Sequence, residues 1–209
     1  MNDQGASASS GGSKGGDETV KISLPFSRSA VESGNVIADA LISIGPSAKN
    51  EGVIQVPRIA EGSFPRLLRL SFDDVPCAYR VDRHARAWYG PGEADVAAAL
   101  SFARSVHRDD PQAFIAVHCE QGRSRSAAIA LMIVADRLGA GSETEAVRRL
   151  LEDDVDGVRC FNPLIVRLAD QLLSRHERLE SALDELCPAF VRWRRYWIEK
   201  AALPVQGGA

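Results

Sequence analysis

A stretch near the middle of the chain constrains the fold more than any other part of the sequence. An apolar run at residues 113–118 is followed by a polar turn and then by the apolar segment AAIALMIVA at residues 127–135. The first run has the length of a buried strand. The second is too short to span a bilayer, and Gly139 follows it as a helix stop. We therefore predict a sharp passage from a strand through a turn into a core helix.

The turn carries a group of reactive residues. It reads Cys-Glu-Gln-Gly-Arg-Ser-Arg-Ser from Cys119 to Ser126, and Gly122 permits a tight backbone path. Backbone N–H groups in such a turn converge on one point, and the following helix adds the positive end of its dipole. This predicts an anion-binding cradle, with Arg125 able to hold two phosphate oxygens. The same electropositive site favours Cys119 as a thiolate, which is a strong nucleophile.

With the preceding His118, the turn forms the string HCEQGRSRS. This string resembles the signature of the protein tyrosine phosphatase superfamily, HC-x5-R followed by Ser, and is most similar to its dual-specificity branch. The resemblance covers roughly residues 36–174. It includes LRLSFDD before the turn and CFNPLIVRLAD after it, which are similar to segments of small bacterial members.

The resemblance implies an α/β fold with a central, mostly parallel sheet flanked by helices and a helical C-terminal half. The order of strands followed by helices independently favours this layer architecture. The chemistry that the resemblance implies is a metal-free, two-step hydrolysis through a phospho-cysteine intermediate, with an aspartate general acid on a separate loop. No cofactor is expected, and the remaining histidines have no metal-ligand spacing.

The resemblance also assigns roles to residues around the turn. Cys119 would be the nucleophile and Arg125 the residue that holds the phosphate. His118 would support the thiolate, although a buried core histidine is an alternative reading. The hydroxyl of Ser126 would assist departure of the sulfur, or serve only as a helix N-cap. The residues expected to bind the phosphate are Glu120, Gln121, Gly122, Arg123, Ser124 and Arg125.

The general acid is expected directly after the strand at residues 67–72, where the family places it. Two carboxylates, Asp73 and Asp74, stand there, and we predict Asp74 as the acid and Asp73 as a solvated turn residue. An insertion at residues 79–89 follows, and it contains the rival candidate Asp82. Asp95 is expected to cap the next helix instead.

Two basic, aromatic segments lie outside the turn. The insertion at residues 79–89 reads YRVDRHARAWY and is either a substrate-reading edge or a plain surface loop. The stretch AFVRWRRYWIEK near the C-terminus is either a helix that packs its aromatic side chains on the domain or one that rests on a membrane surface. Together with Arg123, the insertion favours inositol phosphates as alternative substrates, although Glu120 offsets part of that charge.

Further elements follow from local patterns. Strands are expected at residues 40–44, 53–56 and 67–72, an irregular segment at 75–94, and a helix at 94–107. Later helices are expected to open at Ser142, with Glu145 completing a capping box, and at Asn162, with Pro163 in the first helical position. A last helix should cover much of residues 176–203.

The 209 residues suit one domain with flanking segments. We expect a disordered Gly/Ser-rich tail at 1–19, a phosphatase domain at 20–187, and a C-terminal helix and tail at 188–209. The four cysteines form no CxxC pair, so neither a zinc site nor a disulfide framework is predicted. With no signal-peptide pattern at the N-terminus, we expect a cytoplasmic protein without stable membrane insertion.

These observations define the expected function. The net charge of −3 gives no basic footprint for nucleic acid. The expected partner is a phosphorylated protein or a small phosphoester, hydrolysed at phosphotyrosine and also at phosphoserine or phosphothreonine. One alternative is a phosphatase for inositol phosphates or phosphoinositides. Another is a catalytically weak module that only binds phosphate groups.

Overall fold

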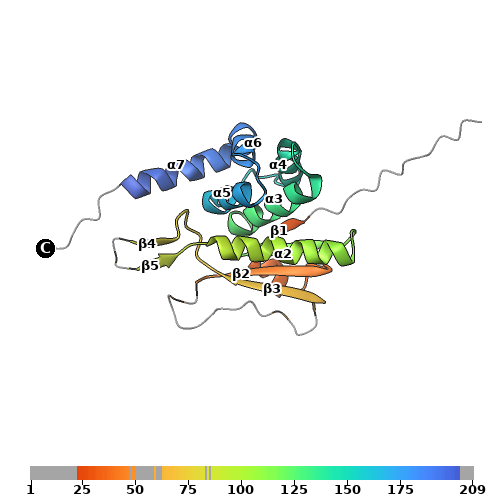
Figure 1. Cartoon of the computed structure of the whole chain (residues 1–209). Coiled ribbons are helices and arrows are strands. Elements are labelled where there is room, and N and C mark those ends of the chain that lie inside the picture. The colour runs from red at the N-terminus through yellow and green to blue at the C-terminus, as the bar shows by residue number, and fades with distance from the viewer. Residues whose placement is uncertain are drawn as a thin grey trace, which may run out of the picture.

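A parallel sheet forms the centre of the molecule (Figure 1). The computed structural model describes residues 23–47, 49, 59, 63–82, 84 and 86–202. Within them, four strands have the spatial order β1-β6-β2-β3, and all neighbouring strands are parallel. These strands are β1 (Leu24–Ser27), β2 (Ala40–Gly45), β3 (Arg66–Ser71) and β6 (Ile115–Cys119). The predicted α/β fold with a central parallel sheet is confirmed.

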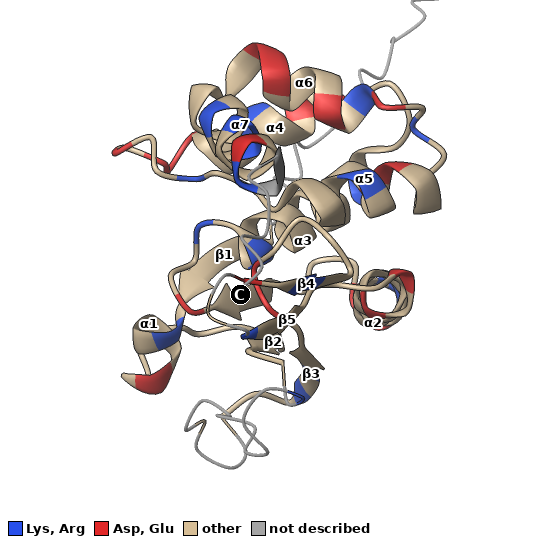
Figure 2. Ribbon diagram, turned by 90° about the vertical axis from the view of Figure 1, so that its left-hand side faces the viewer, with Lys and Arg blue, Asp and Glu red and all other residues tan. Residues whose placement is uncertain are grey.

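Helices cover both faces of this sheet. The described part of the chain contains α1 (Arg28–Glu32), α2 (Glu93–Asp109), α3 (Arg125–Leu138), α4 (Glu143–Leu151), α5 (Pro163–Leu172), α6 (Arg178–Leu186) and α7 (Pro188–Ala202). Figure 2 shows α3 to α7 gathered on one side of the sheet, with α1 on the opposite side. The C-terminal half is therefore helical, as the sequence predicts.

The alternation of side chains along β2 separates two hydrophobic cores. Ala40, Ile42 and Ile44 face the larger core, which the helices from α2 to α6 and the start of α7 complete. Leu41 points to the other face, into a smaller cluster that includes Val31 of α1. Because successive strand residues point to opposite faces, a strand buried on both sides is apolar throughout. The central strand β6 is buried along its whole length for the same reason.

Two strand predictions differ from the structure. The segment predicted as irregular at 75–94 contains an antiparallel hairpin of β4 (Tyr79–Val81) and β5 (Ala87–Tyr89). The carboxylate of Asp82 accepts hydrogen bonds from the backbone N–H groups of His84 and Arg86, and this closes the hairpin turn. Strand β1 was not predicted, because it is short and contains Pro25. A proline is tolerated there since β1 lies at the edge of the sheet.

Two helix predictions also differ from the structure. The single helix expected over residues 176–203 is two helices, because Pro188 lacks the N–H group that would continue α6 and instead opens α7. The capping box at Ser142 is absent: its hydroxyl donates to the carbonyl of Leu138, and it makes no side-chain cap bond. By contrast, Asn162 caps α5 as predicted, and the carboxylate of Asp95 accepts from the N–H of Gly92 at the start of α2.

The tail at 1–19 and the strand expected at 53–56 lie outside the described residues, and the domain boundaries stay predictions. No described helix combines the length and apolarity needed to cross a membrane.

Helix α7 is anchored mainly through its first turn, where Phe190 is fully buried in the larger core. Replacing Phe190 with Ala should lower the free energy of unfolding by about 3–5 kcal/mol, because the change leaves a cavity in packed surroundings. Urea denaturation measures this. Ile198 on the same helix is 63% exposed, so Ile198→Ala should change stability by less than about 0.5 kcal/mol. Equal effects of the two changes would contradict this anchoring.

Candidate active site

Cys119 is the last residue of β6, and a tight turn leads from it into α3. Gly122 in this turn has a φ of +76°. A Cβ atom added there would lie 2.7 Å from the carbonyl carbon of Phe26 in β1. Only glycine accommodates both the left-handed backbone and this close approach. The predicted passage from strand through turn to helix is present, and β1 supports it from one side.

The backbone of the turn is oriented by neighbouring segments that bind its carbonyl oxygens. The N–H of Arg28 donates to the carbonyl of Glu120, and the N–H groups of Cys160 and Phe161 donate to the carbonyl of Arg123. By contrast, the backbone N–H groups of residues 121–124 donate no hydrogen bond within the described part of the chain. These N–H groups, at the N-terminus of α3, can together bind an anion.

Arg125 lies buried at the first position of α3, with 7% of its surface exposed. Its Nη1 donates to the carbonyl oxygens of Gly45 and Phe72, at 3.1 and 2.8 Å, which fixes the plane of the guanidinium. Its Nε is buried and has no hydrogen-bond partner among the described residues. A buried N–H without a partner is costly, so this edge of the guanidinium is suited to binding an anionic ligand.

Two thiols lie in the same cavity but in different surroundings. The Sγ of Cys119 is 3.1 Å from the Oγ of Ser126, which is itself fully buried. Burial, and then the negative charge of Asp74, raise the pKa of Cys160 to about 12. Cys160 therefore stays protonated at neutral pH. Cys119 is the thiol next to the N–H groups of the turn and a buried hydroxyl.

His118 is buried between β6 and β2 and does not reach the cavity lining. Its Nδ1 lies 3.3 Å from the carbonyl oxygen of Cys119, and its Nε2 lies 2.8 Å from the Oγ of Ser43. Because a carbonyl only accepts, the neutral ring carries its proton on Nδ1, and the hydroxyl of Ser43 donates to Nε2. His118 thus holds the backbone at the nucleophile in place, and Ser43 is a partner that the sequence analysis missed.

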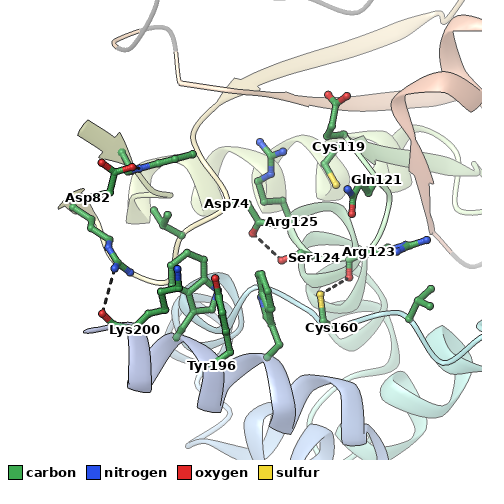
Figure 3. A pocket seen from close by; sticks show the side chains of 17 residues that line it. Asp74, Asp82, Cys119, Gln121, Arg123, Ser124, Arg125, Cys160, Tyr196 and Lys200 are labelled. Atoms are coloured by element: carbon green, nitrogen blue, oxygen red, sulfur yellow. Dashed lines mark hydrogen bonds between the residues drawn. The ribbon is translucent and has the colours of Figure 1, made fainter. Parts of the chain in front are cut away.

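Asp74 is connected to both the turn and α5. Its Oδ1 accepts from the Oγ of Ser124 at 2.7 Å (Figure 3). The same oxygen accepts from the Nδ2 of Asn162 at 2.8 Å. Its Oδ2 accepts no hydrogen bond within the described part of the chain, and Asp74 lines the same cavity as Cys119. One oxygen therefore positions the carboxylate, and the other is available to a ligand. The sequence identified Asn162 only as a helix cap, so this second role was missed.

The two rival carboxylates have structural roles. Asp73 is buried, not solvated as expected, and accepts from the backbone N–H groups of Ser47 and Tyr89. Asp82 accepts from the backbone at the hairpin turn and from the Nε1 of Trp88 at 3.2 Å. Desolvation raises the pKa of Asp82, but these hydrogen bonds hold it below its ordinary value overall. A carboxyl that favours its charged form is a poor proton donor.

The cavity around Cys119 has a volume of about 800 Å³ and extends well beyond the turn. Beyond the turn, it is lined by Arg80 and Trp88 of the hairpin and by four side chains of α7, namely Trp193, Tyr196, Trp197 and Lys200 (Figure 3). The position of the C-terminal helix in the site was not predicted from the sequence. The spacing of its aromatic residues can be read from the sequence, but their position in the cavity that contains Cys119 cannot.

The charged residues of the turn point outward or pair with other elements. Arg123 lines both this cavity and a neighbouring one beside β1, so it lies at the rim. The Oε2 of Glu120 lies 3.8 Å from the Nη1 of Arg28 at the start of α1. Among the described residues there is no group of three or more His, Cys, Asp or Glu side chains that could hold a metal ion.

No protein-family model matches the sequence, and no curated protein is significantly similar to it. Solved structures do match the fold. A human tyrosine phosphatase-like serine/threonine/tyrosine-interacting protein has a TM-score of 0.51 and 14% identity, covering 73% of this chain and 91% of its own. Tk-PTP in its active form has a TM-score of 0.47 and 13% identity, covering 74% and 90%. PTPMT1 in complex with PI(5)P has a TM-score of 0.44 and 18% identity, covering 76% and 90%.

The chain therefore has the fold of the protein tyrosine phosphatase superfamily. The resemblance of the string HCEQGRSRS to the signature of this superfamily agrees with the fold. The roles of the individual site residues are proposals.

The burial of His118 has a consequence for stability at low pH. Desolvation, opposed by the hydrogen bond to the Cys119 carbonyl, lowers the pKa of His118 from 6.5 to about 4. Between these values the unfolded chain binds more protons, so stability should fall as the pH decreases from about 6.5 towards 4. At pH 5 this group should cost about 2 kcal/mol relative to neutral pH.

Urea denaturation at pH 7 and pH 5 measures this effect against a matched variant. In His118→Gln the amide can still bond to Ser43 but does not titrate, so its stability should change less between the two pH values. An identical pH dependence of the wild type and the variant would show that His118 does not cause it.

Proposed function

We propose that this protein is a cysteine-dependent phosphatase that hydrolyses phosphomonoesters in proteins through a phospho-cysteine intermediate. The observation that carries the proposal is Arg125, a buried guanidinium fixed by two backbone carbonyls, whose Nε has no hydrogen-bond partner among the described residues. It lines the same cavity as the Cys119 thiol and the turn, whose N–H groups at residues 121–124 donate no hydrogen bond within the part of the chain that the structure describes. Arginine with backbone N–H groups is a strong combination for binding a phosphate.

In the first step, the Cys119 thiolate attacks phosphorus in line with the ester bond. The N–H groups of the turn and the free edge of Arg125 stabilise the equatorial oxygens. The P–O bond to the leaving group breaks, and Asp74 transfers its proton to the departing oxygen. The free Oδ2 of Asp74 supports this role, because Ser124 and Asn162 hold Oδ1.

In the second step, water attacks the phosphorus of the phospho-cysteine. Asp74 accepts a proton from the water as the P–S bond breaks. The sulfur leaves as a thiolate, and the hydroxyl of Ser126, 3.1 Å away, can donate a hydrogen bond to it. Inorganic phosphate is released, and Asp74 is protonated for the next cycle.

A second candidate function is hydrolysis of inositol phosphates or phosphoinositides. The observation that favours it is that Arg80, Arg123 and Lys200 line the cavity in addition to Arg125. Additional phosphate groups of such a substrate would need cations at these positions. Arg123→Ala should then impair inositol phosphate hydrolysis more than phosphopeptide hydrolysis. The third candidate is a catalytically weak module that only binds phosphate groups, and comparing the wild type with Cys119→Ser tests it.

Cys119→Ser should abolish hydrolysis of an aryl phosphate and retain binding of phosphate esters, because the backbone and Arg125 form the cradle. Steady-state kinetics and calorimetric titration with a phosphopeptide measure the two effects. Cys77→Ser is the matched thiol control, since Cys77 does not line the cavity. Turnover in Cys119→Ser close to wild type would refute the cysteine mechanism. Binding without any wild-type turnover would support the binding module.

Asp74→Asn should slow hydrolysis of phosphoserine or phosphotyrosine peptides by about 10²–10⁴-fold, the usual contribution of a positioned acid. The asparagine keeps an oxygen for Ser124 and Asn162 but cannot supply a proton. An activated aryl phosphate should be slowed much less, because its leaving group needs little protonation. Comparing kcat for the two substrate types measures this.

Asp82→Asn is the control for the acid, because Asp82 lines the same cavity. It should show no dependence on the leaving group. If Asp82→Asn has the leaving-group-dependent defect and Asp74→Asn does not, the acid lies in the hairpin and the assignment of Asp74 is wrong.

A further inference from the structure

Asn162 at the start of α5 makes more hydrogen bonds than a helix cap requires. It is fully buried, and its side-chain Oδ1 accepts from the backbone N–H groups of Leu164 and Ile165, at 3.1 and 3.2 Å. A cap needs only such an oxygen, which serine, threonine or aspartate would also supply. The amide nitrogen of Asn162 takes no part in the cap, so its two N–H groups are available for other contacts.

The amide nitrogen of Asn162 binds the segment that carries the proposed acid. Its Nδ2 donates to the Oδ1 of Asp74 at 2.8 Å and to the backbone carbonyl of Val75 at 3.3 Å. This segment is thus bound at two consecutive residues by the start of α5. Asp73, directly before them, is buried and accepts from the backbone N–H of Tyr89 at 2.8 Å. Both α5 and the hairpin therefore hold the segment that carries the acid.

The two oxygens of Asp74 have different surroundings. Oδ1 accepts from Asn162 and also, at 2.7 Å, from the Oγ of Ser124, whereas Oδ2 accepts no hydrogen bond within the described part of the chain. Donors that bind one oxygen of a carboxyl stabilise negative charge on it and leave the other oxygen to carry the proton. Because Asp74 lines the cavity that contains Cys119, Oδ2 is the oxygen that can meet a leaving group.

We infer that Asn162 is a positioning residue, which holds the Asp74 carboxyl so that Oδ2 presents its proton to the leaving oxygen. The inference rests on the proposed function, because it takes Asp74 to be the acid. Asn162 is not among the described residues that line the cavity, so it acts through Asp74 and not on the substrate. The amide oxygen fixes the first turn of α5, and the amide nitrogen fixes the acid relative to that turn.

Asn162→Ser tests the inference, because a serine hydroxyl can still cap α5 but is too short to reach Asp74. The kcat for a phosphotyrosine peptide should fall by about 10–100-fold, and that for an activated aryl phosphate by less than about threefold. The KM of the peptide should stay within about twofold, since the turn at Cys119 and Arg125 bind the phosphate. A merely structural role would lower both kcat values by the same factor.

Three further variants control the experiment, and thermal unfolding confirms that each is folded. Asn162→Thr keeps a capping hydroxyl and more of the buried volume, and it should have the same defect as Asn162→Ser. Asp95→Ala removes a carboxylate that accepts from the N–H of Gly92 at the start of α2, and it should not change the dependence on the leaving group. Asn162→Ser in the Asp74→Asn background should add no leaving-group-dependent loss, because no acid is left to position.

The outcomes separate this inference from the proposed function. If Asp74→Asn shows the leaving-group-dependent defect and the two Asn162 variants do not, Asn162 is only a helix cap, and the phosphatase mechanism stands without it. Additive losses in the double variant also overturn the inference, because Asn162 would then act independently of Asp74. If Asp74→Asn lacks the defect, or the wild type has no turnover, the proposed function fails at its acid or as a whole, and the inference fails with it.

Discussion

The backbone of the turn at Gly122 passes so close to β1 that no side chain fits between them. This contact, together with the hydrogen bonds from Arg28, Cys160 and Phe161 to the carbonyls of the turn, orients its peptide groups. With the carbonyls bound on the outside, the N–H groups of residues 121–124 are left for a ligand. The anion cradle thus depends on three segments that surround the turn, and not on the turn alone.

Asp74 shows how the catalytic groups of the proposed mechanism are connected. Ser124 in the turn and Asn162 at the start of α5 both donate to its Oδ1. The side-chain oxygen of Asn162 also accepts from the N–H groups of Leu164 and Ile165, and its own backbone N–H donates to Ser124. One buried amide therefore joins the helix, the turn and the proposed acid in a fully bonded network, which favours a single arrangement of the site.

The hairpin and α7 add a second part to the site without changing the sheet. Hydrogen bonds to Asp73 and Asp82 hold the hairpin, and Phe190 and Arg194 hold the helix. Side chains of both elements line the cavity around Cys119. The turn and Arg125 contribute N–H groups and positive charge to the cavity, whereas α7 and the hairpin contribute aromatic side chains.

The sequence by itself determined the features that depend on neighbouring residues: the strand, the Gly122 turn and the helix around Cys119 and Arg125, and the cap at Asn162. It did not predict that Asp73 is buried, that Ser43 binds His118, or that α7 faces Cys119. Asp74 bonds to residues 50 and 88 positions further along the chain, and Arg80 bonds to one 120 positions away. No local pattern encodes such contacts. Only the tertiary structure decided them, because the packing of the sheet and helices brings these distant segments together.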